Sequence, residues 1–394
     1  MSRLFSPMKI GCLELPNRFV RSATFEGMAK ENGQVTDDVM KLYRNLAKGK
    51  VGLIITGYFY VNQVGKSFSN QIGIHSDEMI RGLKKLVQEV HDQDGKVVFQ
   101  LAHAGRQTTK RVTGQSPIGP SAKGRDPIFF VKPREMDEDD IQETIRSFGK
   151  AAKRAVEAGA DGIQLHGAHG YLINQFLSPF YNTRNDAWGE SEEGRFRFLE
   201  QVLLDIKRAI PKEIPIMIKL NTHDHTPSEG VTPGLAAYYA GRLAEMGIDA
   251  VEISSGTAFY SFMDICRGRV PVQELADTMP FWKKPIAKIK LSRLVGKYEL
   301  EEGYHIEAAK IIKPVLGDVP LLLVGGMRRV EHMEEVLEQG YADFISMSRP
   351  FVREPFLVKR IETGKTDRAS CVSCNRCLAA TTDKRPLRCY YKPE

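Results

Sequence analysis

Two histidines and a tyrosine lie close together near the middle of the chain, in the segment GIQLHGAHGYL at residues 162–172. His166 and His169 are three residues apart, and Tyr171 follows two residues later. Two imidazoles can hold a substrate carbonyl oxygen between donors while a phenol delivers a proton. The same histidines could instead form part of a metal site or be structural, although no third histidine or carboxylate lies nearby in the sequence. We expect catalytic roles for Tyr171, His166 and His169.

Four of the six cysteines lie within the last 24 residues. Cys371, Cys374 and Cys377 are separated by two residues each, and Cys389 follows after eleven more. Three thiols on one loop with a more distant fourth suit either tetrahedral zinc or a [4Fe–4S] cluster. The spacing does not separate these two metals from each other, and a set of cysteines without metal is a third alternative.

Composition and charge limit the class of protein. The chain has 394 residues, 42% hydrophobic and 27% charged, which excludes a disordered or collagenous chain and suits one large barrel with an appendage. The net charge is +7, and the ten basic and five acidic residues from position 351 onward contribute +5 of it. The sequence has neither a long uncharged apolar run nor a secretory leader, so we expect a cytoplasmic protein with no membrane association.

The elements that must position the reactive residues follow a βα rhythm. The expected strands are residues 18–23, 52–56, 97–101, 162–165, 216–220, 250–253, 321–324 and 344–346. Several are continuous apolar runs, as is typical of strands covered on both faces in a parallel sheet. Eight such strands predict an α/β fold, a (β/α)8 TIM barrel, and in such barrels the catalytic groups follow the C-terminal ends of the strands.

Helices and loops complete this prediction. Helices are expected at residues 136–158 and 232–246, where acidic residues or a Thr-Pro pair begin the helix and a glycine follows it. The long segments 102–133 and 256–303 follow strands, so we expect them on the catalytic face as lids or substrate walls. We expect residues 1–355 to form the barrel and residues 356–394 to form a short C-terminal cysteine-rich metal-binding extension that includes a helix.

The motifs, taken together and in order, resemble the Old Yellow Enzyme family of FMN-dependent barrel ene-reductases and NADH:flavin oxidoreductases. The resemblance rests on HGAHGYL with its downstream SP, NRD and WG, together with PMKIG, PNRFVRSATFEG, QLAHAGRQ, IKL, EISSG, VGGM and FISMSRPFVREP. These motifs extend over most of the chain, and most of them coincide with expected strand ends.

The resemblance implies an FMN site. Carried over position by position, it places Ala23, Thr24 and Gly57 against the flavin ring and Gln100 at the pyrimidine edge of the ring. Lys219 corresponds to a basic residue beside flavin N1, where a cation stabilises the reduced flavin. The residues expected at the phosphate are Gly325, Gly326, Ser348 and Arg349.

The resemblance also implies a reaction. NAD(P)H reduces the flavin and leaves, and hydride then passes from flavin N5 to the β carbon of an α,β-unsaturated enone or enoyl substrate. His166 and His169 polarise the carbonyl group, and Tyr171 protonates the α carbon. A second enzymatic interpretation is an amine or C–H dehydrogenase that passes electrons through a cluster to a partner protein.

The cysteine segment is similar to the [4Fe–4S] segment in the dienoyl-CoA reductase and trimethylamine dehydrogenase branch of the family. In that branch a FAD and nucleotide-binding module follows the cluster, and we expect no such module here because five residues follow Cys389. We expect the cluster, with zinc as the alternative, and an electron-transfer partner protein is one source of electrons. A homo-oligomer is compatible with the resemblance. The basic C-terminus could indicate a nucleic-acid-binding zinc knuckle, but that interpretation leaves the barrel motifs unexplained, so we expect no nucleic-acid partner.

Overall fold

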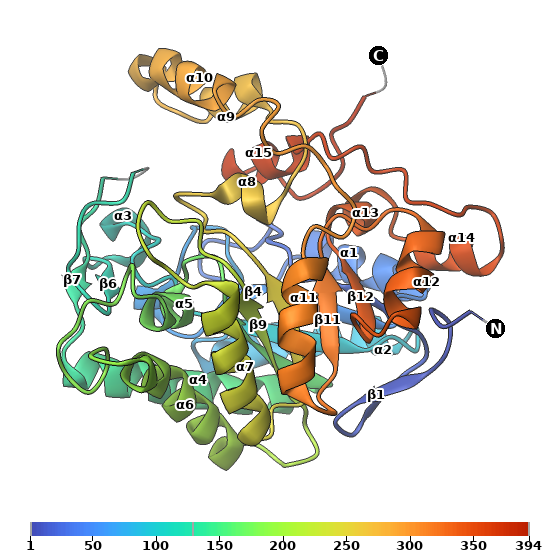
Figure 1. Ribbon diagram of the computed structural model, residues 1–394, viewed down its shortest axis with the longest axis horizontal. Helices are drawn as coiled ribbons and strands as arrows, with labels where there is room; N and C mark the ends of the chain where they lie inside the picture. The colour runs from blue at the N-terminus through green and yellow to red at the C-terminus, as the bar shows by residue number, and fades with distance from the viewer. Residues whose placement is uncertain (1, 128–129, 393–394) are drawn as a thin grey trace.

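Eight parallel strands close into a barrel at the centre of the computed structural model, which describes residues 2–127 and 130–392 (Figure 1). The barrel strands are β3 (Phe19–Arg21), β4 (Leu53–Tyr60), β5 (Val97–Ala102), β8 (Gly162–Gly167), β9 (Ile216–Asn221), β10 (Ala250–Ser254), β11 (Leu321–Val324) and β12 (Phe344–Met347). Each pairs with the next in the chain, and β12 pairs with β3 to close the ring. The (β/α)8 barrel and its eight expected strands are confirmed.

Helices surround this barrel. The helices around it are α1 (Asp37–Lys48), α2 (Ile80–His91), α4 (Glu138–Glu157), α6 (Glu192–Ala209), α7 (Pro233–Glu245), α11 (Ile306–Ile312), α12 (Val330–Glu338) and α14 (Leu357–Glu362). The two helices expected from their start and stop signals are α4 and α7. Asp137 caps α4 through the Asp140 N–H, and Thr232 caps α7 through the Leu235 N–H, so polar side chains satisfy backbone donors that the first helical turn leaves free.

Further elements lie in the loops and at the termini. They are α3 (Lys110–Thr113), α5 (Leu172–Leu177), α8 (Phe262–Ile265), α9 (Val272–Asp277), α10 (Lys284–Ser292), α13 (Arg349–Arg353) and α15 (Arg376–Thr382), with 3₁₀ turns at Gln63–Gly65, Asp77–Met79, Phe281–Lys283 and Lys313–Leu316. Two small sheets pair β1 (Met8–Ile10) with β2 (Leu13–Leu15) and β6 (Ile118–Gly119) with β7 (Arg134–Glu135).

Apolar side chains form two cores. The larger one lies between the barrel and the helices. The smaller one fills the inside of the barrel and consists of Ile10, Leu15, Val20, Leu53, Ile55, Val98, Met217, Ala250, Leu322 and Phe344. Ile10 and Leu15 come from the β1–β2 hairpin, which therefore contributes to the inner core. The polar residues discussed below lie at the other end of the barrel, where the strands end.

The two long loops follow β5 and β10, as expected from the sequence. Arg106 fixes the first loop by donating to the carbonyls of Lys123 and Gly124 at 2.9 and 3.1 Å. The second loop carries α8, α9 and α10, and Figure 1 shows α9 and α10 projecting from the top of the molecule above α15. Within residues 2–127 and 130–392, no helix combines the length and apolar character needed to cross a bilayer.

Candidate active site

The expected catalytic triplet gathers where β8 ends. His166 is in the last part of β8, and His169 and Tyr171 follow in the turn that leads into α5. The rings of His166 and His169 meet edge to face with their centroids 5.2 Å apart, and the Tyr171 ring lies 4.7 Å from that of His166. A left-handed conformation at His169 (φ 61°) turns the chain back over the barrel, which brings the three rings together.

Burial controls the charge of both histidines. It lowers the pKa of His166 and of His169 well below the usual value, and the nearby Lys219 lowers both further. Both imidazoles are therefore neutral near pH 7 and each carries one N–H donor. His169 Nε2 pairs with Ser254 Oγ at 2.8 Å, whereas His166 Nδ1 is buried without a partner among the described residues.

A second tyrosine, which sequence reasoning missed, lies against the first. The Tyr171 hydroxyl donates to the Tyr58 hydroxyl at 3.0 Å, and the two rings are 5.0 Å apart. Burial raises the pKa of Tyr171, while the hydroxyls of Tyr58 and Ser67 act in the opposite direction. Phe25 stacks on the other side of Tyr58 at 5.5 Å. Tyr58 reaches this position because β4 contains one extra residue between its pairings Ile55–Val98 and Tyr58–Gln100.

A chain of polar side chains crosses the barrel from β5 to the end of β3. Gln100 donates to Gln164 at 2.6 Å, and Gln164 donates to Glu252 at 2.9 Å. Glu252 pairs with Lys219 at 3.2 Å, and Lys219 donates to Ser22 at 2.7 Å. The strand register produces this chain, because Gln100 is opposite Gln164 and Lys219 is opposite Glu252. Gln100 and Lys219 were expected from the sequence, whereas Gln164 and Glu252 were not.

Several buried polar atoms at the strand ends have no partner among the described residues. They are Gln100 Oε1, Glu252 Oε1, His166 Nδ1 and Ser346 Oγ. Unpaired buried polar atoms are costly, so their concentration at one end of the barrel indicates a polar ligand. A flavin ring presents alternating N–H and C=O groups along its pyrimidine edge, which match an amide, a lysine and a carboxylate. These residues therefore fit the FMN ring that the resemblance implies.

Two of the residues expected at the ring have other contacts here. Ala23 is partly buried and packs on the inner core. The Gly57 N–H donates to Glu26 Oε1 at 2.6 Å and to the Tyr43 hydroxyl at 3.0 Å. A Cβ at position 57 would lie 2.1 Å from Glu26 Oε2, so the buried Glu26 side chain requires glycine at this position.

The expected phosphate residues lie in the loops after the neighbouring strands β11 and β12. Ser348 Oγ lies 2.6 Å from Thr24 Oγ1, which brings the end of β3 against the end of β12. Gly325 and Gly326 have φ of 155° and 77°, which other residues rarely adopt, so glycine permits the backbone to turn here. His305, which the sequence analysis missed, holds the same loop through Val324 O at 2.6 Å and also pairs with Ser255 Oγ at 2.7 Å. Burial lowers the pKa of His305 to about 4.

Arg349 lies between the expected phosphate site and the cysteine segment. Its NH1 donates to Arg267 O at 2.8 Å and to Asn375 Oδ1 at 2.6 Å. Asn375 belongs to the cysteine loop and has a left-handed φ of 57°. The guanidinium thus ties the loop after β12 to the cysteine loop, a contact that the sequence did not reveal.

The four expected metal-ligating cysteines line one small pocket of about 20 Å³. Cys371, Cys374 and Cys377 come from one loop and Cys389 from the C-terminal segment, and all four are free thiols. Burial raises the pKa of Cys377 to about 12. Within the part of the chain that the structure describes, no three or more His, Cys, Asp or Glu side chains are close enough together to bind an ion. The donor set suits a four-thiolate metal, but the thiols must move to enclose one.

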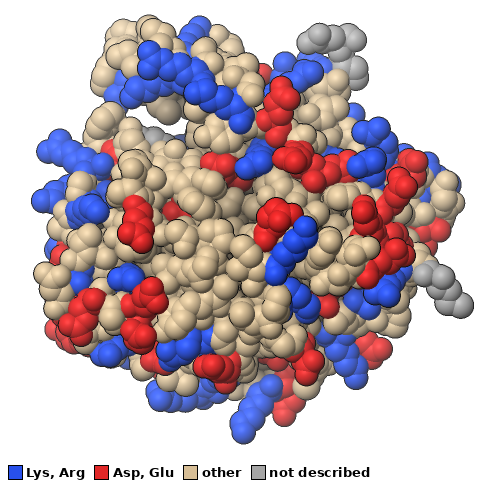
Figure 2. Space-filling view, viewed as in Figure 1, with Lys and Arg blue, Asp and Glu red and all other residues tan. Residues whose placement is uncertain are grey.

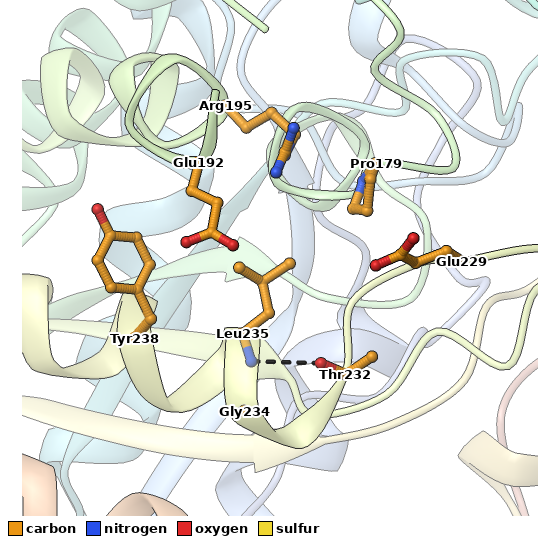
Figure 3. A pocket seen from close by; sticks show the side chains of 8 residues that line it. All are labelled: Pro179, Glu192, Arg195, Glu229, Thr232, Gly234, Leu235 and Tyr238. Atoms are coloured by element: carbon orange, nitrogen blue, oxygen red, sulfur yellow. Dashed lines mark hydrogen bonds between the residues drawn. The ribbon is translucent and has the colours of Figure 1, made fainter. Parts of the chain in front are cut away.

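Figure 3 shows a larger pocket, of about 380 Å³, which has a different lining. It is lined by residues of α6, α7 and the loops beside them, namely Pro179, Glu192, Arg195, Glu229, Thr232, Gly234, Leu235 and Tyr238. None of the expected site residues contributes to it. We therefore place the candidate active site at the strand ends and not in this pocket.

Comparison with known proteins identifies the family. A family model described as NADH:flavin oxidoreductase / NADH oxidase matches residues 3–368. The chain belongs to this family. Membership in the NADH:flavin oxidoreductase / NADH oxidase family confirms the resemblance inferred from the motifs and the expectation of a flavin-type oxidoreductase.

Relatives within the family differ in length. The NADH oxidase of Thermoanaerobacter brockii is 33% identical over 397 residues, which cover 99% of this chain but 56% of that protein. The chain thus spans little more than half the length of this relative. The NADPH dehydrogenase of Bacillus subtilis is 32% identical over 358 residues, covering 91% of this chain and 93% of that one. The structure of an old yellow enzyme homologue from Zymomonas mobilis superimposes with a TM-score of 0.74 at 25% identity, covering 94% of this chain and 95% of that one.

Proposed function

We propose that the protein is an FMN-dependent oxidoreductase that takes electrons from NAD(P)H and reduces the double bond of an α,β-unsaturated carbonyl compound. The observation that carries the proposal is the group of unpaired buried polar atoms above the inner core, with two neutral histidines and a tyrosine beside them. In this proposal FMN, when bound, supplies the hydride.

The histidine pair binds and polarises the substrate oxygen. His166 Nδ1 has no partner among the described residues, and His169 keeps Nδ1 for a ligand because its Nε2 is held by Ser254. Two neutral donors in a site shielded from water favour an oxygen that gains negative charge during the reaction. Burying a charged imidazolium without a counter-ion costs free energy. Because the pKa values of both histidines are lowered, the two rings are neutral and this cost does not arise.

Tyr171 is the proton donor in this proposal. Its hydroxyl is buried and its pKa is raised by burial, so it carries its proton at neutral pH. Its position 4.7 Å ring to ring from His166 places the donor beside the group that holds the carbonyl oxygen. The α carbon of a substrate bound there is bonded to the carbonyl carbon, two bonds from that oxygen, which suits protonation by Tyr171.

The half-reactions test this assignment. In Tyr171→Phe we expect reduction of the enzyme by NAD(P)H within about twofold of wild type and alkene reduction slowed by about 10²-fold or more, the usual contribution of a positioned acid. Tyr239→Phe is the matched control. Tyr239 is also a buried tyrosine, but it belongs to α7, and its hydroxyl donates to Leu177 O at a distance of 2.8 Å. Equal slowing of both half-reactions in Tyr171→Phe removes it from the donor role. Flavin absorbance of the purified protein is the first measurement, and a preparation that binds no FMN contradicts the proposal.

The cysteine segment, residues 356–394, is proposed to hold a [4Fe–4S] cluster through Cys371, Cys374, Cys377 and Cys389. The four thiols line one pocket, which supports a shared ligand. Iron and sulfide analysis of anaerobically purified protein should give about four of each per chain, the composition of such a cluster. One zinc per chain with no iron contradicts the cluster and supports the alternative site. Cys377→Ser should lower the metal content, whereas Cys12→Ser, at an exposed cysteine outside the segment, should not.

A further inference from the structure

Residues 278–298 form a strongly basic projection, which we call the basic arm. It contains Lys283, Lys284, Lys288, Lys290, Arg293 and Lys297 and no Asp or Glu, so it carries a charge of +6 in a chain whose net charge is +7. Among ion pairs between described residues, Lys284 alone of these six has a partner, Asp277 at 3.2 Å. Figure 2 shows blue side chains along this projection at the upper left, where it extends away from the barrel.

The same arm exposes large apolar side chains. Phe281 is 84% exposed and Trp282 is 62% exposed, and Ile286, Ile289 and Val295 are each more than half exposed. No residue of α10 is buried. Exposed apolar groups gathered on one element and surrounded by charge are typical of a surface that another macromolecule covers, and aromatic residues are enriched at the centre of such interfaces.

The base of the basic arm is joined to the cysteine loop. The Gly268 N–H donates to Tyr298 O at 2.6 Å, which closes the base. From this base the Arg269 N–H donates to Ser373 O at 3.0 Å, and the Asn375 amide donates to Cys266 O at 2.8 Å. Beside it, Glu274 of α9 pairs with Arg376 of α15 at 2.9 Å. A macromolecule that covers the basic arm therefore comes to lie next to the cysteine pocket.

We propose that the basic arm docks an acidic electron-carrier protein, which exchanges electrons with the enzyme beside the cysteine pocket. The charge of the arm favours an acidic partner surface, and the exposed aromatic pair supplies an apolar centre for the contact. A second copy of this chain is disfavoured at this surface because its own basic arm, with the same +6 charge, would repel the first. A membrane surface would not explain why the base of the arm is bonded to the cysteine loop. This inference rests on the proposed function, because it supplies the electrons for that reaction.

The electron balance is simple. Reduction of one C=C bond forms two C–H bonds and consumes two electrons and two protons. Two molecules of a reduced one-electron carrier are each oxidised by one electron, and the protons come from solvent, one of them through Tyr171. The carrier is thus a second source of electrons beside NAD(P)H, and the residues that bind the substrate stay the same.

Binding can be measured without activity. The chain has two tryptophans, and Trp188 is 8% exposed and donates to Glu138, so Trp282 is the solvent-exposed reporter. With the holoenzyme, we expect a purified acidic ferredoxin at low salt to change Trp282 emission in a saturable way, and about 0.3 M NaCl to abolish the change because salt screens the contact. Trp282→Phe should remove the signal. Absence of any saturable change with either an acidic ferredoxin or an acidic flavodoxin overturns the proposal.

Two charge-reversal variants, one in the basic arm and one elsewhere on the surface, test where the carrier docks. Lys288→Glu/Lys290→Glu/Arg293→Glu should lower the second-order rate of electron exchange with reduced ferredoxin at least tenfold at low salt. The matched control is Arg81→Glu/Lys84→Glu/Lys85→Glu, three exposed basic residues of α2, which should change this rate less than twofold. Equal losses in both variants contradict docking at the basic arm.

Three further outcomes separate the proposal from its competitors and from the proposed function. Arm-dependent binding to vesicles with 30% anionic lipid, with no ferredoxin effect, identifies a membrane surface and overturns the proposal. A dimer that dissociates on charge reversal of the arm identifies a second copy and does the same. NAD(P)H-dependent reduction of a small enone should be equal in all variants. If wild type lacks this activity, the proposed function is contradicted, and ferredoxin binding remains a separate test of the basic arm.

Discussion

The hydroxyl oxygens of Tyr58 and Tyr171 lie 3.0 Å apart and join β4 to the loop after β8. Because each hydroxyl can donate or accept, Tyr58 can turn its proton toward Tyr171 when that phenol gives up its own. The pair therefore provides an acid together with the group that stabilises its conjugate base.

We expect Tyr58→Phe to slow alkene reduction by about 10- to 100-fold, because a hydrogen bond to a charged group contributes about 1.5–3 kcal/mol. Flavin reduction by NAD(P)H should be unaffected. The pKa of Tyr171 should rise because it loses a donor to the phenolate, so the basic limb of the pH profile for alkene reduction should move upward. Stopped-flow kinetics of the two half-reactions, from pH 7 to well above the ordinary tyrosine pKa of about 10, measure both effects. A basic limb at the same pH as in wild type contradicts the role given to Tyr58.

Glu252→Gln should make the flavin easier to reduce. Burial lowers the pKa of Lys219, and the Glu252 carboxylate opposes that effect, so the carboxylate helps the lysine to keep its proton. Its negative charge also offsets the positive potential that the lysine produces at the flavin. While Lys219 keeps its proton, loss of the negative charge should raise the reduction potential by about 30 mV for each 1.4 kcal/mol of added stabilisation. The variant should also lose about 3–5 kcal/mol of stability, as expected when one member of a buried pair is removed. Spectroelectrochemistry over a range of pH measures the potential, with the exposed Glu301→Gln as control. An unchanged or lower potential at the acidic end of that range, where Lys219 keeps its proton, contradicts this account.

Gly57→Ala should destabilise the protein by about 1–3 kcal/mol or more, because its Cβ would overlap the buried Glu26 carboxylate. Gly234→Ala on α7 is the matched control, since a Cβ there meets nothing within 4 Å. That change should be neutral or stabilising by up to about 1 kcal/mol. Chemical denaturation compares the two variants, and equal stabilities would show that the loop holding Glu26 yields easily.

Acid should destabilise the protein through its buried histidines. Burial lowers the pKa of His103 to about 3 in the folded protein, whereas the ordinary histidine pKa is about 6.5. Between these two pH values the unfolded chain binds a proton at His103 and the folded chain does not. The stability is therefore complete above that pH and is lost as the pH falls toward 3, at up to about 1.4 kcal/mol per pH unit for each such histidine. In His103→Asn the dependence of unfolding free energy on pH should become shallower by one proton between pH 6 and 4. The same slope as wild type contradicts this assignment.

Much of the fold and part of the site could be predicted from the sequence, for physical reasons. Buried parallel strands give continuous apolar runs, and His166, His169 and Tyr171 are close in sequence. Tyr58 was missed because simple alternation along β4 turns position 57 inward, and the extra residue in the strand reverses that order. Gln164 and Glu252 were missed although polar residues inside apolar strands are themselves a signal, since burial without a partner is costly. The contact of Arg349 with Asn375 joins residues from separate loops and has no local pattern.

That contact links the two groups that we propose for this protein, the FMN and the cluster in the cysteine segment. Arg349 is expected at the FMN phosphate and at the same time holds Asn375 in the cysteine loop. A group that orders the Asn375 loop therefore also helps to hold Arg349 in place for the FMN phosphate, and bound FMN helps to order the loop. Such coupling is reciprocal in free energy. If Cys371, Cys374, Cys377 and Cys389 hold the proposed cluster, we therefore expect FMN to bind less tightly in protein prepared without iron, because the loop that Asn375 belongs to is then less ordered around Arg349.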